Sequence, residues 1–202
     1  MKLDQYYTKS SVANWCIDRL EKDLPSVFNK HFIEPSAGNG EFFNLLPKHR
    51  RTGIDIEPNG KDIKYADFLK WNPPLKDKKK YVIVGNPPFG KRSNLAIDFF
   101  NHSADMAETI AFIVPRQFQK YSVHSKLDEN FRLIRDYELS ENSFYIPNGK
   151  DYKVRCDFQI WTSEETHHKN LRLLTPPPTF HPDFISDQYN NTPEALKVFD
   201  RD

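Results

Sequence analysis

Short apolar runs that alternate with helical patterns constrain the fold of this sequence more than any other feature. The runs at 81–85 (YVIVG) and 108–115 (ETIAFIVP) are almost wholly apolar, which is typical of strands that are covered on both faces. Helical patterns at 9–24 and 94–106 precede them. This alternation predicts an α/β layer fold with a mostly parallel sheet.

Weaker patterns complete the set of expected elements. We expect Ser10 or Ser11 to cap the first helix, because a hydroxyl can accept a bond from an unpaired N–H of the first turn. The remaining predictions are a strand, a glycine turn and a helix start within 31–43, strands at 51–58, 63–71, 131–139 and 153–161, and a helix within 119–130.

The composition fits one globular domain with a short extension. The 202 residues include 16 Phe, 9 Tyr and 3 Trp, and these large rings can supply a core. No stretch approaches the roughly 18 apolar residues of a membrane span, and the first ten residues lack the apolar centre of a signal peptide. Two cysteines, Cys16 and Cys156, are too few for a disulfide framework or a paired metal motif. We therefore expect a soluble cytoplasmic protein without a metal or a membrane partner.

Charge is distributed unevenly along the chain. Residues 1–100 carry 17 Lys and Arg against 12 Asp and Glu, whereas residues 101–202 carry 12 against 16. The basic excess is densest between Lys48 and Arg92 and includes the run Lys76–Lys80. This asymmetry is compatible with a polyanionic partner, although the run taken alone favours a solvated lysine-rich loop.

The segment 34–40 (EPSAGNG) joins a predicted strand to a predicted helix. Its glycines allow a sharp turn and a close approach of a ligand to the main chain. It lacks the third glycine of the dinucleotide fingerprint, because that position is Phe43, so a nucleoside ligand is favoured over a pyrophosphate. Asp55 and Glu57 follow at the end of the next strand, where an acidic residue can bind ribose hydroxyls. An ordinary tight turn remains the alternative.

The tetrapeptide Asn86-Pro87-Pro88-Phe89 directly follows the apolar run 81–85. Two prolines stiffen this loop and remove two N–H donors. The Asn86 side chain and the Pro87 carbonyl can thus offer two acceptors to a flat NH₂ group, beside the ring of Phe89. Because ligands of open α/β sheets bind beyond the carboxyl ends of the strands, this loop and segment 34–40 are expected to face one crevice.

These motifs, in this order, resemble those of the S-adenosylmethionine-dependent N6-adenine DNA methyltransferases of the γ type. The resemblance covers most of residues 4–161 and implies a Rossmann-like class I methyltransferase fold with a seven-stranded, mostly parallel sheet, helices on both faces and one antiparallel strand near an edge. It implies that the cofactor S-adenosylmethionine is bound by Tyr7, Thr8, Glu34, Ser36, Gly38, Asp55, Ile56, Asp67, Phe68 and Asn86.

The resemblance also implies the chemistry. Asn86 and Pro87 accept hydrogen bonds from the adenine amine, which aims its lone pair at the methyl group, and Phe89 stacks on a base that has been flipped out of the duplex. We expect Phe144 or Tyr145 to provide a second aromatic face. Lys91 and Arg92 follow the loop directly, and together with Lys76–Lys80 they are the candidates for phosphate contacts with double-stranded DNA.

The sequence departs from the family in its size. We predict a catalytic domain at 1–163 and a Pro-rich extension at 164–202, without a recognisable target-recognition domain. Specificity would then be short or relaxed, or would come from a homodimer or a specificity subunit. Alternatives that remain open are methylation of RNA adenine or of protein glutamine by a related enzyme, and a non-catalytic methyltransferase-like subunit.

Overall fold

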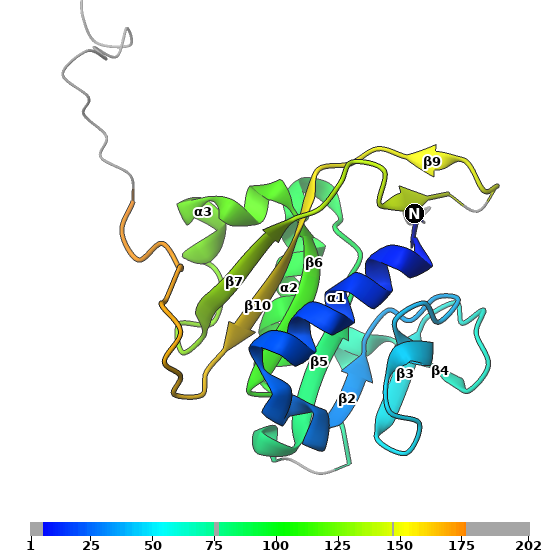
Figure 1. The fold of residues 1–202 in the computed structure, drawn as a ribbon, viewed down its shortest axis with the longest axis horizontal. Helices are drawn as coiled ribbons and strands as arrows, with labels where there is room; N and C mark the ends of the chain where they lie inside the picture. Colours follow the sequence, from blue (N-terminus) through cyan, green and yellow to red (C-terminus); the bar gives the residue numbers. More distant parts are fainter. Residues whose placement is uncertain (1–5, 75–76, 147, 177–202) are drawn as a thin grey trace, which may run out of the picture.

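The computed structural model describes residues 6–74, 77–146 and 148–176. Its centre is a seven-stranded sheet in the order β4-β3-β2-β5-β6-β10-β7 (Figure 1). The strands are β2 (His31–Glu34), β3 (Arg51–Asp55), β4 (Ile63–Tyr65), β5 (Tyr81–Gly85), β6 (Thr109–Pro115), β7 (Arg132–Glu138) and β10 (Cys156–Thr162).

Strand direction in this sheet follows the sequence-based expectation. Strands β4, β3, β2, β5 and β6 pair in parallel, while β10 pairs antiparallel with both β6 and β7. The predicted antiparallel strand is therefore β10, which is inserted one position from the edge. The parallel strands all end at one border, here called the carboxyl edge, and all begin at the opposite border, here called the amino edge.

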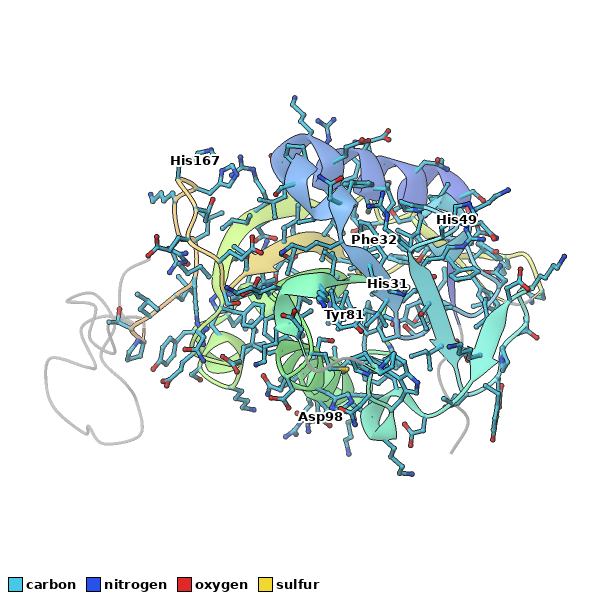
Figure 2. The ribbon with its side chains drawn as sticks, turned by 90° about the horizontal axis from the view of Figure 1, so that it is seen from below. His31, Phe32, His49, Tyr81, Asp98 and His167 are labelled. Atoms are coloured by element: carbon cyan, nitrogen blue, oxygen red, sulfur yellow. The ribbon has the colours of Figure 1, made fainter. Side chains whose placement is uncertain are left out.

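Helices cover both faces of the sheet, as predicted. Helix α1 (Ser10–Asp23) packs on the face that carries Val82 and Val84, and α2 (Asn94–Ala104) packs on the face that carries Ile83. Figure 2 looks along the sheet with these two helices on opposite sides. Every residue of β5 is buried because the side chains alternate between two covered faces, which explains its uninterrupted apolar run.

A second, smaller sheet lies beyond the carboxyl edge (Figure 1). It contains β1 (Tyr7–Thr8), β8 (Phe144–Tyr145) and β9 (Asp151–Tyr152) in the antiparallel order β1-β8-β9. Strands β8 and β9 form a hairpin between β7 and β10. The Lys9 Nζ–Asp151 Oδ1 ion pair, at 2.8 Å, ties this hairpin to the start of α1.

Three local predictions near the amino-terminal half are wrong. Only a short 3-10 turn, Phe43–Leu45, follows the glycine turn, because Pro47 prevents the helix from continuing. The strand expected at 63–71 ends at Tyr65, since Asp67 Oδ1 accepts the Leu69 N–H (3.2 Å) and starts another 3-10 turn. Neither serine caps α1: Ser10 is its first residue, and its hydroxyl donates to Glu41 Oε2 at 2.6 Å.

The helix expected within 119–130 is reduced to α3 (Tyr121–His124). The guanidinium of Arg172 explains why, since it donates to the carbonyls of His124, Leu127, Asp128 and Phe131. The His124 and Asp128 carbonyls also accept the N–H groups of Leu127 and Phe131, three residues further on, so this segment forms turns tied to Arg172 and not a continuous α-helix.

Part of the predicted extension thus packs on the domain. The Leu171 N–H donates to the Leu133 carbonyl of β7 at 2.7 Å. Residues 177–202 of the extension lie outside the described residues. In the described part of the chain, no helix is long and apolar enough to cross a membrane.

Candidate active site

A pocket of about 320 Å³ lies at the carboxyl ends of β2, β3 and β5. Ligand pockets commonly start at about this size. Its lining includes nine residues that the sequence singled out: Tyr7, Ser36, Gly38, Asp55, Ile56, Asp67, Phe68, Asn86 and Pro87. A smaller cavity of about 40 Å³ shares several of these residues and adds Thr8 and Glu34.

Asp55 joins the glycine turn to the end of β3. Its Oδ2 accepts the Gly38 N–H and its Oδ1 accepts the Glu57 N–H, both at 2.7 Å. Gly38 has φ +49°, and a Cβ there would lie 3.2 Å from the Tyr7 ring, so a side chain at this position would be both strained and crowded. The two N–H groups hold the Asp55 carboxylate at the pocket wall, where its remaining lone pairs can accept hydroxyl groups.

The other end of the pocket combines apolar surface with a carboxylate. Ile56 is 42% exposed and lines the pocket beside the buried ring of Phe68. Asp67 bonds Lys70 Nζ at 2.9 Å, and this hydrogen bond lowers the pKa of Asp67. An ionised acceptor next to apolar walls suits a flat heterocycle that carries an NH₂ group.

The smaller cavity contains two buried acceptors that lack donors. Among the described residues, neither Glu34 Oε2 nor Asn86 Oδ1 has a hydrogen-bond partner. Burial, with the nearby Asp55 and Glu41, raises the pKa of the Glu34 carboxyl well above its usual range, although a hydrogen bond from the Phe43 backbone opposes this. Unpaired buried acceptors are costly. A cationic group with several N–H donors would therefore fit here.

The loop after β5 is fixed from two sides. Asn86 Nδ2 donates to Thr8 Oγ1 at 3.1 Å, and Ser36 Oγ donates to the Asn86 carbonyl at 2.9 Å. Pro87 is buried and lines the pocket. Phe89 is partly buried and meets the ring of Tyr6 edge-on, at 5.3 Å between centroids.

The structure corrects one of the two predicted aromatic faces. Phe144 is fully buried in the core next to α1, so it has no exposed face for a base. Tyr145 is half-buried, and its hydroxyl bonds Asn39 Nδ2 (2.8 Å) and Glu41 Oε1 (3.4 Å) beside the glycine turn.

Sequence reasoning missed Tyr6, which lines both cavities and contacts Phe89. The only signal was its place beside Tyr7 in the segment DQYYT.

Only some of the candidate phosphate contacts lie near the pocket. Lys91 and Arg92 are exposed and directly follow the loop after β5, and Arg92 has the left-handed φ of 55°. The lysines of the run 76–80 that the structure describes precede β5 and lie at the amino edge, where Lys78 Nζ donates to the Ala104 carbonyl. These lysines therefore do not line the pocket, and their contact with nucleic acid stays a prediction. Figure 2 views this amino edge, with His31 and Tyr81 labelled at the starts of β2 and β5.

No protein-family model and no curated protein sequence matches the chain. Solved structures do. A candidate RNA methyltransferase of Pyrococcus horikoshii superposes with a TM-score of 0.60 at 17% identity, over 79% of this chain and 88% of that one. The methyltransferase subunit of a type I restriction-modification system from Streptococcus thermophilus gives 0.60 at 14% identity, over 82% and 46%.

A candidate class I S-adenosylmethionine-dependent methyltransferase of Listeria monocytogenes gives a TM-score of 0.58 at 16% identity, over 85% of this chain and 63% of that one. At such identities the likeness shows the fold. The predicted Rossmann-like class I methyltransferase fold is thereby confirmed.

Proposed function

We propose that this chain transfers a methyl group from S-adenosylmethionine to the exocyclic N6 amine of adenine in DNA. The observation that carries the proposal is the buried Oδ1 of Asn86, which has no donor among the described residues and lies in the loop N-P-P-F beside a nucleoside-sized pocket. An acceptor without a donor in the apo protein is what an amine substrate or an ammonium group requires.

The pocket residues support the cofactor assignment. Asp55 would accept the ribose hydroxyls, while Ile56 and Phe68 would contact the adenine ring and Asp67 would accept its amine. Glu34, with Tyr7 and Thr8 beside it, would bind the methionine ammonium group in the smaller cavity. When bound, the cofactor supplies the electrophilic methyl group.

The loop residues would position the substrate amine. Its nitrogen is a weak nucleophile because its lone pair is delocalised into the ring. Hydrogen bonds from this amine to Asn86 Oδ1 and to the Pro87 carbonyl would favour a pyramidal nitrogen, and Ser36 fixes the loop through the Asn86 carbonyl. The amine nitrogen would bond the methyl carbon as the carbon–sulfur bond breaks, which would leave a neutral thioether as the leaving group, and the nitrogen would then lose a proton to water. The catalytic contribution of the chain is therefore geometric and electrostatic.

RNA is the second candidate substrate, because a candidate RNA methyltransferase is among the similar solved structures. The present chain matches nearly the full length of the Pyrococcus candidate RNA methyltransferase but under half of the Streptococcus DNA-modification subunit. On DNA, sequence specificity would be short or relaxed, or would come from a homodimer or a specificity subunit.

The test is methyl transfer from labelled S-adenosylmethionine to unmethylated DNA and to RNA, with nucleoside mass spectrometry. We expect N6-methyladenine from DNA with the wild type and at least about a hundredfold less with Asn86→Ala. If methylated adenine were found in RNA and not in DNA, RNA would replace DNA as the proposed substrate. Methylation of neither polymer would overturn the proposal, and calorimetry with S-adenosylmethionine would then identify a non-catalytic subunit if it also showed no binding.

A further inference from the structure

A chain of stacked rings connects the catalytic loop to the surface of the β8–β9 hairpin. Phe89 meets Tyr6 edge-on, and Tyr6 stacks on Tyr152 with 5.0 Å between centroids and 15° between planes. Tyr6 lines the pocket, whereas Tyr152 is 39% exposed. Tyr6 covers one face of the Tyr152 ring, and the exposed part of this ring is outside the lining of both cavities.

The hairpin that carries Tyr152 is anchored to the domain. Strand β8 pairs with β1 and places the buried Phe144 opposite Tyr152. The Phe144 ring also meets Tyr6 edge-on at 5.7 Å. The Lys9–Asp151 ion pair adds a second connection. The outer ring is thus presented at a fixed position relative to the pocket.

The charged side chains of the hairpin that form no ion pair within the described residues are lysines. Asp151 is neutralised by Lys9, and Arg155 is paired with Glu141 at 2.7 Å. Lys150 and Lys153 are exposed, and within the described residues neither forms an ion pair. Two lysines flank the exposed tyrosine in sequence, a combination that suits a nucleic acid strand, because bases stack on aromatic rings while lysines contact phosphates.

We propose that the β8–β9 hairpin is a nucleic-acid-docking surface, in which Tyr152 stacks on a base that flanks the target adenine and Lys150 and Lys153 contact the backbone phosphates. The inference rests on the proposed function and deepens it, since the hairpin would hold the strand that the N-P-P-F loop methylates. It assigns strand binding to a hairpin of the catalytic domain itself.

The experiment measures binding of short fluorescent DNA, single-stranded and duplex, and of RNA of the same sequence, over a series of salt concentrations. We expect Tyr152→Ala to weaken binding about five- to fiftyfold, and Tyr152→Phe to bind like the wild type because it keeps the ring. We expect Lys150→Ala with Lys153→Ala to lower the salt slope by about 1.4 on single strands and about 1.8 on duplexes.

The chain offers a matched control at the amino edge. Lys79→Ala with Lys80→Ala removes the same charge from exposed positions far from the pocket, so it should leave the slope unchanged. S-adenosylmethionine affinity, measured by calorimetry, should be unaltered in Tyr152→Phe and in the Lys150→Ala, Lys153→Ala variant. Because Tyr152 packs on Tyr6 and its loss could disturb β1, the lysine pair gives an independent test.

Equal slopes for both lysine pairs, together with wild-type binding by Tyr152→Ala, would overturn the inference even if the enzyme methylates DNA. Binding of an acidic peptide in place of any nucleic acid would overturn it as well. A hairpin-dependent loss of strand binding in a protein that transfers no methyl group would support the docking surface and refute the proposed function, so the two failures can be told apart.

Discussion

The two edges of the central sheet differ in how completely their polar groups are paired. At the amino edge, Lys30 bonds Glu164 and lies 3.6 Å from Glu108, and Lys80 lies near Asp77. Of the eight buried side-chain atoms without a hydrogen-bond partner in the described residues, five lie at the carboxyl edge, on Glu34, Asn86, Arg116 and Asp157. Thr109 Oγ1 is the exception at the amino edge.

Unpaired buried groups and dense charge therefore point to opposite edges of the sheet, and the proposed site is at the edge with the unpaired groups. The densest run of lysines precedes β5 and is at the amino edge, while Glu34, Asn86 and Arg116 end or directly follow parallel strands, and Asp157 lies near the start of the antiparallel β10. Buried groups that lack partners destabilise the folded chain, and such residues persist at sites where a ligand can satisfy them.

The largest expected effect comes from comparing a substitution in the proposed cofactor site with a matched substitution at the amino edge. Asp55→Ala removes the carboxylate that bonds the Gly38 and Glu57 N–H groups, and we expect S-adenosylmethionine affinity to fall by about 2 to 3 kcal/mol, or about 30- to 150-fold. Asp77→Ala is the matched control, because Asp77 similarly accepts an N–H, from Lys79, but at the amino edge. Calorimetry that finds equal losses for the two variants would contradict the comparison.

Asp157 tests whether unmet polar groups at the carboxyl edge are costly. Burial, with Asp136, raises the pKa of Asp157 to about 6, although Arg116 opposes the shift. The folded pKa is above the unfolded one, so burial of the charge destabilises the fold above about pH 6, and this penalty disappears as the pH falls to about 4. We expect Asp157→Asn to raise the free energy of unfolding by about 1 to 2 kcal/mol at neutral pH and by nothing near pH 4.

Urea denaturation at both pH values measures this difference. A destabilised Asp157→Asn at neutral pH would mean that the Arg116–Asp157 contact, at 3.6 Å, outweighs the burial of the carboxylate.

Local sequence patterns were sufficient to predict the candidate site residues that end or directly follow a recognisable strand. Asn86 follows an apolar strand, and Asp55 ends another, so their meeting at one crevice follows from parallel pairing. The position of the lysine run could have been predicted in the same way, because a segment that precedes a parallel strand lies at the opposite edge from one that follows it.

Long-range contacts explain the remaining errors. Phe144 and Tyr145 are neighbours with similar rings, and only the pairing of β1 with β8 decides that Phe144 enters the core. Likewise, Arg172 bonds carbonyls of the α3 region that are more than forty residues away in sequence, and no local signal predicts that this interaction replaces a longer helix.

The pH dependence of cofactor affinity at Glu34 is a further test of the comparison between the two edges. Its buried carboxyl has a raised pKa in the free protein, so binding of an ammonium group at Glu34 requires that the carboxyl lose its proton. We expect S-adenosylmethionine affinity to rise with pH, by up to about tenfold per unit while Glu34 is protonated in the free protein. The groups that act on Glu34 are Asp55 and Glu41, which raise its pKa, and the Phe43 N–H, which lowers it.

Calorimetry in buffers of different ionisation enthalpy measures the released proton directly. Glu34→Gln should bind more weakly and release no proton. Proton release that persists in this variant would assign the linkage to another group.

The smallest expected effect concerns the paired charges of the amino edge. Lys30→Met leaves Glu108 and Glu164 close together without their cation, and burial and Glu164 already raise the pKa of Glu108. Because these side chains remain partly exposed, we expect a loss of at most about 1 kcal/mol in the free energy of unfolding. Adding Glu108→Gln should recover part of it, since it removes the repulsion between the two carboxylates.

Neither variant should change cofactor affinity or methyl transfer, because the whole sheet lies between these charges and the pocket. A change in either activity would mean that the two edges are coupled, and the contrast between a satisfied edge and a ligand-binding edge would then no longer hold.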